Sequence, residues 1–134
     1  QMCIRDRPQS IANTSTPTFG GVTVGSVTLT DALLGTATQA LTGGTATVVD
    51  SWAASSYSGA KYLVQMKKNN DIEIIEVLVA VDGNNNVYLT EYADVISNTQ
   101  LGTTDADYSG GNVRLLVTAS NGVTVKVQKT LIEA

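Results

Sequence analysis

Apolar and polar residues alternate with a period of two through most of the chain beyond residue 44. In the stretch 123–128, valines at the odd positions are separated by polar residues at the even positions. Successive side chains of a β-strand point to opposite faces, so this pattern predicts strands that bury one face. We expect such strands over residues 45–52, 60–67, 72–81, 87–96, 113–119 and 123–132.

Turn signals separate these stretches. The run Asp-Gly-Asn-Asn-Asn at 82–86 contains residues that tolerate a positive φ, and Ser-Asn-Gly at 120–122 contains a pair that suits a type I′ turn. No stretch shows the periodicity of a helix of useful length. Six closely spaced strands without a helix predict an all-β fold, namely an antiparallel β-sandwich of the jelly-roll or Ig-like kind.

The segment 8–44 has a different composition. It is rich in threonine and glycine, and Asp31 is its only charged residue. Alternation at 22–24 and 27–30 favours short strands, and Asp31 is placed to cap one helical turn. The segment has too little bulky apolar surface for a separate core, so we expect it to lean on the following domain or on neighbouring chains. We therefore predict an extended Thr/Gly-rich segment over 8–44 and a β-sandwich domain over 45–134.

The first seven residues, Gln1 to Arg7, resemble the translated end of an adapter used to prepare sequencing libraries. We interpret residues 1–7 as an artefact and leave them out of the fold prediction. Cys3 is the only cysteine of the chain, so without it neither a disulfide nor thiol chemistry is expected. On this interpretation the natural protein extends further upstream, and the chain is a C-terminal piece of it.

The charge distribution disfavours two classes of partner. The formal net charge is −4, and no lysine or arginine lies between Arg7 and Lys61. Binding to nucleic acid needs a clustered basic face, because affinity comes largely from neutralised phosphates. No apolar run reaches the roughly 18–20 residues that span a bilayer. We therefore expect neither a nucleic-acid partner nor insertion into a membrane.

Candidates for catalysis are few. Histidine is absent, which removes the usual triads and the common zinc and copper ligand sets. Paired carboxylates are the remaining route to hydrolysis, and the two strands of the long hairpin carry Glu73, Glu76, Glu91 and Asp94. No sequence feature supplies a cleft around them, and a row of charges that faces solvent explains them equally well. We expect no catalytic residue and no enzymatic activity.

One turn has a partial likeness to a calcium-binding loop. Asp82, Asn84 and Asn86 stand at alternate positions, as at the start of such a loop. However, Val87 takes the place of the required glycine, and Ala93 takes the place of the bidentate glutamate. A hairpin turn explains the three polar residues without a metal. We therefore expect no metal and no cofactor.

Aromatic residues concentrate beyond residue 51. Large amphipathic side chains ordinarily fill the core of a small sandwich, and that is the interpretation we favour. The functional alternative is a surface on which sugar rings stack, with Trp52, Tyr57, Tyr88 and Tyr92 as candidates. Tyr88 and Tyr92 stand four residues apart on one strand, so they are expected to share a face.

Four charged residues stand within apolar strand contexts: Lys61, Glu76, Glu91 and Arg114. An isolated buried charge is costly, so any of them that is buried needs a partner of opposite sign. We predict that one of these two cations pairs with one of these two carboxylates, and that this pairing is structural.

Two stretches carry a resemblance to known proteins. The first is Thr-Phe-Gly-Gly-Val-Thr-Val-Gly at 18–25. The second covers about 48–132 and includes Ala-Lys-Tyr-Leu-Val-Gln at 60–65, Glu-Val-Leu-Val at 76–79, Thr-Glu-Tyr at 90–92, Leu-Gly-Thr at 101–103 and Gly-Gly-Asn-Val-Arg-Leu-Leu-Val at 110–117. These stretches resemble tail-fibre and other virion structural proteins of marine tailed bacteriophages, including those that infect cyanobacteria and pelagic bacteria.

The resemblance implies an extended, often trimeric appendage that is assembled in the host cytoplasm and becomes part of the virion. We therefore expect a non-enzymatic structural domain of a tail fibre or similar appendage, whose partners are copies of itself and other virion proteins. Two alternatives stay open. One is a carbohydrate- or cell-surface-binding module at a fibre tip that contacts a host glycan, and the other is a domain of a bacterial surface adhesin.

Overall fold

The computed structural model describes residues 20–134, which form nine strands. No helix of this part is long and apolar enough to cross a membrane. The all-β prediction is confirmed, whereas the interpretation of residues 1–7 lies outside the described residues. In chain order the strands are β1 (Ser26–Thr28), β2 (Ala32–Ala40), β3 (Thr47–Ala53), β4 (Tyr57–Lys68), β5 (Asp71–Val81), β6 (Val87–Ile96), β7 (Gly102–Ser109), β8 (Asn112–Ala119) and β9 (Thr124–Glu133).

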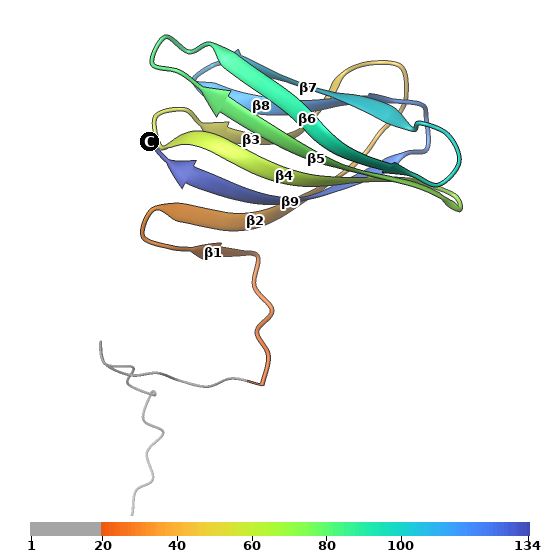
Figure 1. Cartoon of the computed structure of the whole chain (residues 1–134), viewed down its shortest axis with the longest axis horizontal. Coiled ribbons are helices and arrows are strands. Elements are labelled where there is room, and N and C mark those ends of the chain that lie inside the picture. Colours follow the sequence, from red (N-terminus) through yellow and green to blue (C-terminus); the bar gives the residue numbers. More distant parts are fainter. Residues whose placement is uncertain (1–19) are drawn as a thin grey trace, which may run out of the picture.

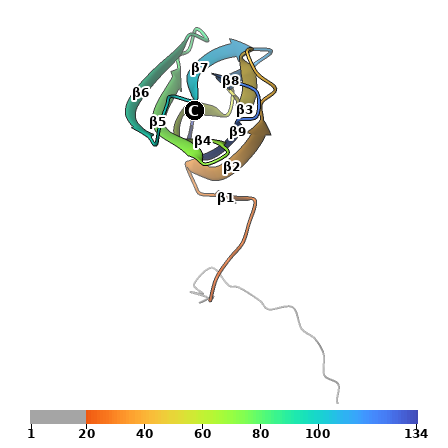
Figure 2. The same cartoon turned by 90° about the vertical axis from the view of Figure 1, so that its right-hand side faces the viewer.

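The strands form two antiparallel sheets that pack against each other. The larger sheet has the order β1-β2-β9-β4-β5-β6, and the smaller has the order β3-β8-β7. Figure 1 shows the two layers, and the end-on view in Figure 2 shows the larger sheet curving around the smaller one. The predicted antiparallel β-sandwich is therefore confirmed. The last strand, β9, lies between β2 and β4, so early and late parts of the chain are neighbours within one sheet.

The core lies between the sheets and follows the alternation of the sequence. On β9, Val125 and Val127 are buried, whereas Lys126 and Gln128 between and beside them are exposed. The same alternation holds on the neighbouring strands. Their buried members are Ala60, Tyr62, Val64 and Met66 on β4, Ile75, Val77 and Val79 on β5, and Val113, Leu115 and Val117 on β8.

The larger sheet begins earlier in the chain than the sequence predicted. β2 lies within the segment 8–44, yet it pairs with β9 along its whole length, starting with Ala32 opposite Ile132. Gly35 of β2 is buried, and Leu41, directly after the strand, is 4% exposed. The sandwich therefore includes β2, and its boundary moves from residue 45 to before Ala32. The reason is that β9 has an edge whose backbone groups need a partner, which β2 supplies.

The connection between β1 and β2 is a tight turn, and the helical turn expected at Asp31 is wrong. Leu29 N donates a hydrogen bond to Ala32 O at 2.7 Å and closes the turn. Glu133 N donates to Asp31 O at 2.9 Å, which ties the turn to the end of β9. A short segment of four residues has little helical stability of its own, so pairing with β9 decides its conformation.

The sequence prediction missed β7. Its residues contain no aliphatic side chain larger than that of alanine, so no apolar alternation marks the strand. It forms an edge of the smaller sheet and pairs with β8 through a two-residue connection. The connecting residues, Gly110 and Gly111, have φ values of 59° and 88°, and both are positive as a type I′ turn requires. The turn and the partner strand therefore specify β7.

Candidate functional site

Four polar side chains meet between the two sheets and form a connected hydrogen-bond network. Lys129 Nζ on β9 donates to both carboxylate oxygens of Asp50 on β3, at 2.7 and 2.9 Å. Tyr62 Oη on β4 donates to Asp50 Oδ2 at 2.7 Å and accepts a hydrogen bond from Trp52 Nε1 at 3.1 Å. The network therefore joins the smaller sheet to two central strands of the larger sheet.

This network is a structural cross-link rather than a reactive site. The side chains of Lys129 and Asp50 are 12% and 8% exposed, and Tyr62 is fully buried. Burial raises the pKa of the Tyr62 hydroxyl well above its ordinary value, and the negative charge of Asp50 raises it further. Tyr62 consequently stays a neutral donor. Because both oxygens of Asp50 accept hydrogen bonds inside the protein, the carboxylate has little capacity left for a ligand.

Lys129 is not among the site residues predicted from the sequence, although a signal for it exists. Position 129 has the same phase on β9 as the buried residues Val127 and Leu131, so a lysine there had to point inward. Gly35 stands opposite Lys129 on β2. A Cβ atom at Gly35 would lie 3.1 Å from Lys129 Cε, so the glycine leaves room for the inward lysine stem.

The structure separates the four aromatic residues predicted to stack on sugars. Trp52 is 5% exposed and belongs to the core, so the prediction of a glycan contact at Trp52 is wrong. Tyr57 is half-buried and packs edge-on against Trp52, with ring centres 6.5 Å apart and planes at 88°. Tyr88 and Tyr92 are 58% and 48% exposed. These two tyrosines on β6 are therefore the members of the set that present their rings to solvent.

One predicted charge pair is present at the surface. Lys61 Nζ lies 3.8 Å from Glu76 Oε1, and the two side chains are 57% and 33% exposed. An exposed pair of this kind contributes about 0–1 kcal/mol. Glu91 accepts a hydrogen bond from the Thr104 hydroxyl instead of pairing with a cation. The Lys61–Glu76 pair therefore exists, but it is a minor stabilising interaction.

Arg114 pairs with a residue that the prediction did not consider. Its Nε and Nη2 atoms donate to the two oxygens of Asp107 at 2.7 and 2.5 Å. These hydrogen bonds lower the pKa of Asp107, and Asp107 raises the pKa of Arg114 in return. The predicted pairing of Lys61 or Arg114 with Glu76 or Glu91 is therefore met by Lys61 and Glu76, whereas Arg114 pairs with Asp107, which stands directly opposite it on β7.

Of the four hairpin carboxylates, Glu73 and Asp94 approach each other, whereas Glu76 lies on the outward face. Glu73 is fully buried between the sheets. Glu73 Oε2 accepts hydrogen bonds from Leu101 N at 2.5 Å and Gly102 N at 3.4 Å, while Oε1 has no protein donor. Burial raises the pKa of Glu73, and the negative charge of Asp94 adds to the effect. Within residues 20–134, no three His, Cys, Asp or Glu side chains are grouped to hold a metal.

The Asp82 carboxylate organises the β5–β6 turn. Its Oδ1 accepts hydrogen bonds from the backbone N–H groups of Asn84 and Asn86, each at 2.9 Å. Its Oδ2 accepts from the Asn86 side-chain amide at 2.9 Å and from the Tyr88 hydroxyl at 3.1 Å. These hydrogen bonds, the Asn86 side-chain bond first, lower the pKa of Asp82 to about 2. The turn thus engages both carboxylate oxygens and also orients Tyr88.

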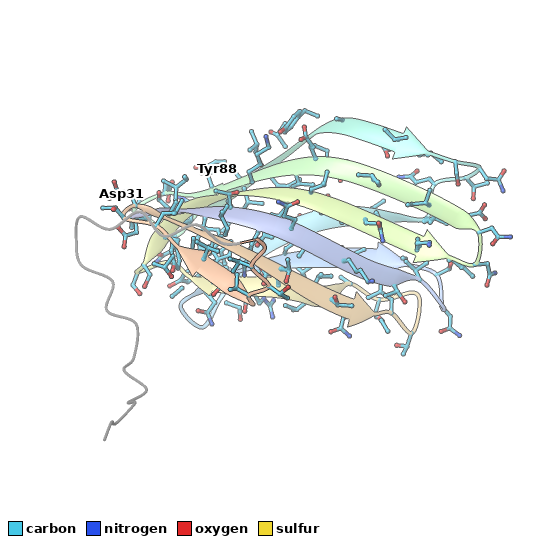
Figure 3. The ribbon with its side chains drawn as sticks, turned by 90° about the horizontal axis from the view of Figure 1, so that it is seen from below. Asp31 and Tyr88 are labelled. Atoms are coloured by element: carbon cyan, nitrogen blue, oxygen red, sulfur yellow. The ribbon has the colours of Figure 1, made fainter. Side chains whose placement is uncertain are left out.

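The outward face of the larger sheet contains an open hollow of about 600 Å³. Two rows of paired residues line it across β9, β4, β5 and β6. Small side chains occupy the middle of one row and larger ones its ends, and Tyr88 stands at the end of the sheet where Asp31 also lies (Figure 3). The first row is Ile132, Gly59, Ala80 and Tyr88, and the second is Thr130, Lys61, Leu78 and Thr90.

The comparisons with known proteins give structural similarity only. No family model matches the chain, and no curated protein matches it. The fold is similar to the tailspike protein of Acinetobacter phage vB_ApiP_P1, with 15% identity and a TM-score of 0.48 over 90% of this chain. It is also similar to the tailspike protein of Acinetobacter baumannii phage AM24, with 10% identity and a TM-score of 0.41 over 77% of this chain. The chain spans 26% of each of those proteins, and at such low identities and TM-scores neither similarity assigns a function.

Proposed function

We propose that this chain is a non-enzymatic structural domain of a bacteriophage virion appendage, such as a tail fibre, and that it works by associating with copies of itself and with other virion proteins. The observation that supports the proposal is the arm formed by residues 20–30. Its four large apolar side chains are 39–66% exposed, namely Val22, Val24, Val27 and Leu29. Apolar side chains gathered on an extended segment are typical of a surface that a partner covers.

Two further features support a mechanical role. The resemblance of residues 18–25 and 48–132 to phage virion proteins concerns the arm and the sandwich together. The pairing of Lys129 with Asp50 connects the two sheets, and a hydrogen-bonded network of this kind makes the packing of the two layers more rigid. Both features suit a rigid module in an extended assembly.

The first experiment is to measure the solution mass of residues 8–134 by light scattering over a hundredfold range of concentration. We expect an oligomer of defined size, and a trimer is the state that the proposal favours. Circular dichroism on the same samples establishes that the protein is folded. A folded monomer at every concentration contradicts the proposal.

A second candidate function is recognition of a host-surface glycan. The observation that favours it is the exposed ring of Tyr88 at the edge of the hollow, with Tyr92 on the same strand. Aromatic faces stack on the apolar faces of sugar rings. Binding on a glycan array that is lost in Tyr88→Ala, and kept in Tyr108→Ala on the smaller sheet, supports this function. Equal binding by both variants contradicts it.

A further inference from the structure

The arm has more apolar surface than its own sheet covers. β1 pairs with β2 over three residues, Ser26 to Thr28, and residues 20–25 before it belong to no strand. Val22 and Val24 are 66% and 54% exposed in this part. Figure 1 shows the segment running away from the sandwich. Its backbone and its side chains are therefore free to contact another surface.

The hollow on the outward face offers such a surface. Gly59 and Ala80 face each other at its floor, and Ile132 and Tyr88 stand on either side of them. Ile132 is 52% exposed, Leu78 is 45% exposed, and both contribute to the lining. Gly59 and Ala80 therefore leave a depression between Ile132 and Tyr88, which Lys61 and Leu78 bound along β4 and β5.

The chemistry of the hollow suits an uncharged apolar peptide. Lys61 is the only charged residue of its lining, and its Nζ atom lies 3.8 Å from the Glu76 carboxylate. The arm from Gly20 to Thr30 contains no charged residue. A threonine- and valine-rich segment can therefore enter this hollow without burying a charge of its own.

We propose that the arm of one copy of this chain packs into the hollow of a second copy. The proposal rests on the self-association in the proposed function and names the surfaces that mediate it. The contact covers apolar groups of both copies, since the large apolar side chains of the arm and Leu78, Tyr88 and Ile132 of the hollow are each 39–66% exposed. Because two different surfaces meet, the contact is head-to-tail, and three copies can close it into a ring.

Two variants test the proposal from opposite sides. Val22→Ser combined with Val24→Ser removes the apolar groups of the arm, and Ala80→Trp fills the hollow from an exposed position on β5. We expect each variant to keep its circular dichroism spectrum and to weaken self-association about tenfold or more, since a few central apolar anchors dominate an interface. Val95→Ser, which changes an exposed residue of β6 outside the hollow, is the matched control and should associate like the wild type.

Mixing the two variants establishes that the contact joins different copies. The Ala80→Trp chain keeps an intact arm, and the arm variant keeps an intact hollow, so their mixture should form a heterodimer that neither forms alone. If the wild type is oligomeric but the mixture stays monomeric, or if the variants associate normally, the arm-and-hollow contact is wrong while self-association stands. If the wild type is a folded monomer at every concentration, both proposals fail.

Discussion

At the scale of single residues, the fold depends on the nearly buried charge pair of Lys129 and Asp50, whose side chains are 12% and 8% exposed. Burying Lys129 and Asp50 costs several kcal/mol of desolvation for each ion, and their attraction offsets this cost only with good geometry. Here the lysine contacts both carboxylate oxygens, and the Tyr62 hydroxyl supplies a third donor. The intact pair therefore contributes little net free energy of folding. Removing one member is strongly destabilising, because it leaves the other charge without a partner.

Replacing Lys129 with methionine tests this asymmetry. The Lys129→Met variant leaves the Asp50 carboxylate buried without its cation, so we expect a loss of about 3–5 kcal/mol in the free energy of unfolding. Adding Asp50→Asn should recover part of the loss, because it removes the unpaired charge and keeps an acceptor for Tyr62. Lys126→Met on the outward face of β9 is the control and should change stability by less than about 0.5 kcal/mol. Urea unfolding measures all three, and equal losses in the single and double variants would contradict the argument.

Glu73 makes stability depend on pH in a direction opposite to that of most carboxylates. Because the folded state raises the pKa of Glu73, the folded protein holds this proton at pH values where the unfolded chain has released it. Stability from this group is therefore present below the ordinary glutamate pKa and is lost as the pH rises through the raised value. Asp82 and Asp107, whose pKa values are lowered, act in the opposite sense at lower pH.

The Glu73→Gln variant isolates this contribution. Glutamine keeps an acceptor for Leu101 N and cannot ionise, so we expect the variant to be more stable than the wild type at pH 7. Below about pH 4 the difference should shrink, because glutamate is then protonated in both states. Urea unfolding at a series of pH values gives the difference directly. A difference that stays constant with pH would contradict the assigned ionisation.

At the scale of the elements, alternation predicted the strands that bury one face against aliphatic neighbours. β4, β5, β8 and β9 follow it, and their inward faces are those that the sequence indicates. β7 was missed because Thr, Asp and small residues carry no alternation, and the pairing of Arg114 with Asp107 on that strand was therefore not predicted. The hollow could not be predicted either, since it depends on which strands are neighbours. Gly59 and Ala80 meet only because β4 and β5 pair in one register.

The connection into β7 is the element most sensitive to a small substitution. A Cβ atom at Gly102 would lie 2.8 Å from both Met66 Sδ and Thr118 O, and the second is backbone that cannot move aside. We expect Gly102→Ala to destabilise the protein by about 1–3 kcal/mol through overpacking. Gly83→Ala is the control, since nothing lies within 4 Å of its Cβ position and its φ is not positive. Thermal unfolding compares the two variants. Equal melting temperatures would contradict the prediction that a methyl group at residue 102 overpacks the core.

At the scale of the whole molecule, β1 and β2 form one side of the larger sheet. β9 lies between β2 and β4, so without the N-terminal part of the chain β9 itself becomes an edge of the sheet. The Thr/Gly-rich composition of residues 8–44 gave no sign of this role, because β2 derives its order from nine pairings with β9 rather than from its own apolar residues. The arm before it pairs with its own sheet only through the three residues of β1, which lie opposite residues 33–35 of β2. Composition predicts residues 8–44 as one segment. In the structure β2 belongs to the sandwich, whereas the arm pairs with it over only three residues.

Two truncations separate the contributions of β2 and the arm. A chain that starts at residue 30 keeps β2 and lacks β1 and the residues before it. Its free energy of unfolding should stay within about 1 kcal/mol of that of residues 8–134. A chain that starts at residue 45 also loses Leu41 from the core and exposes the edge of β9, and we expect it to lose several kcal/mol and to aggregate. Urea unfolding and light scattering on the three chains decide between the two domain boundaries. If the chain from residue 45 unfolds at the same urea concentration as the longest one, β2 is dispensable and the sandwich does begin at residue 45. If the chain from residue 45 unfolds at a lower urea concentration or aggregates while the chain from residue 30 is stable, β2 completes the sandwich. The arm alone is then available to a partner.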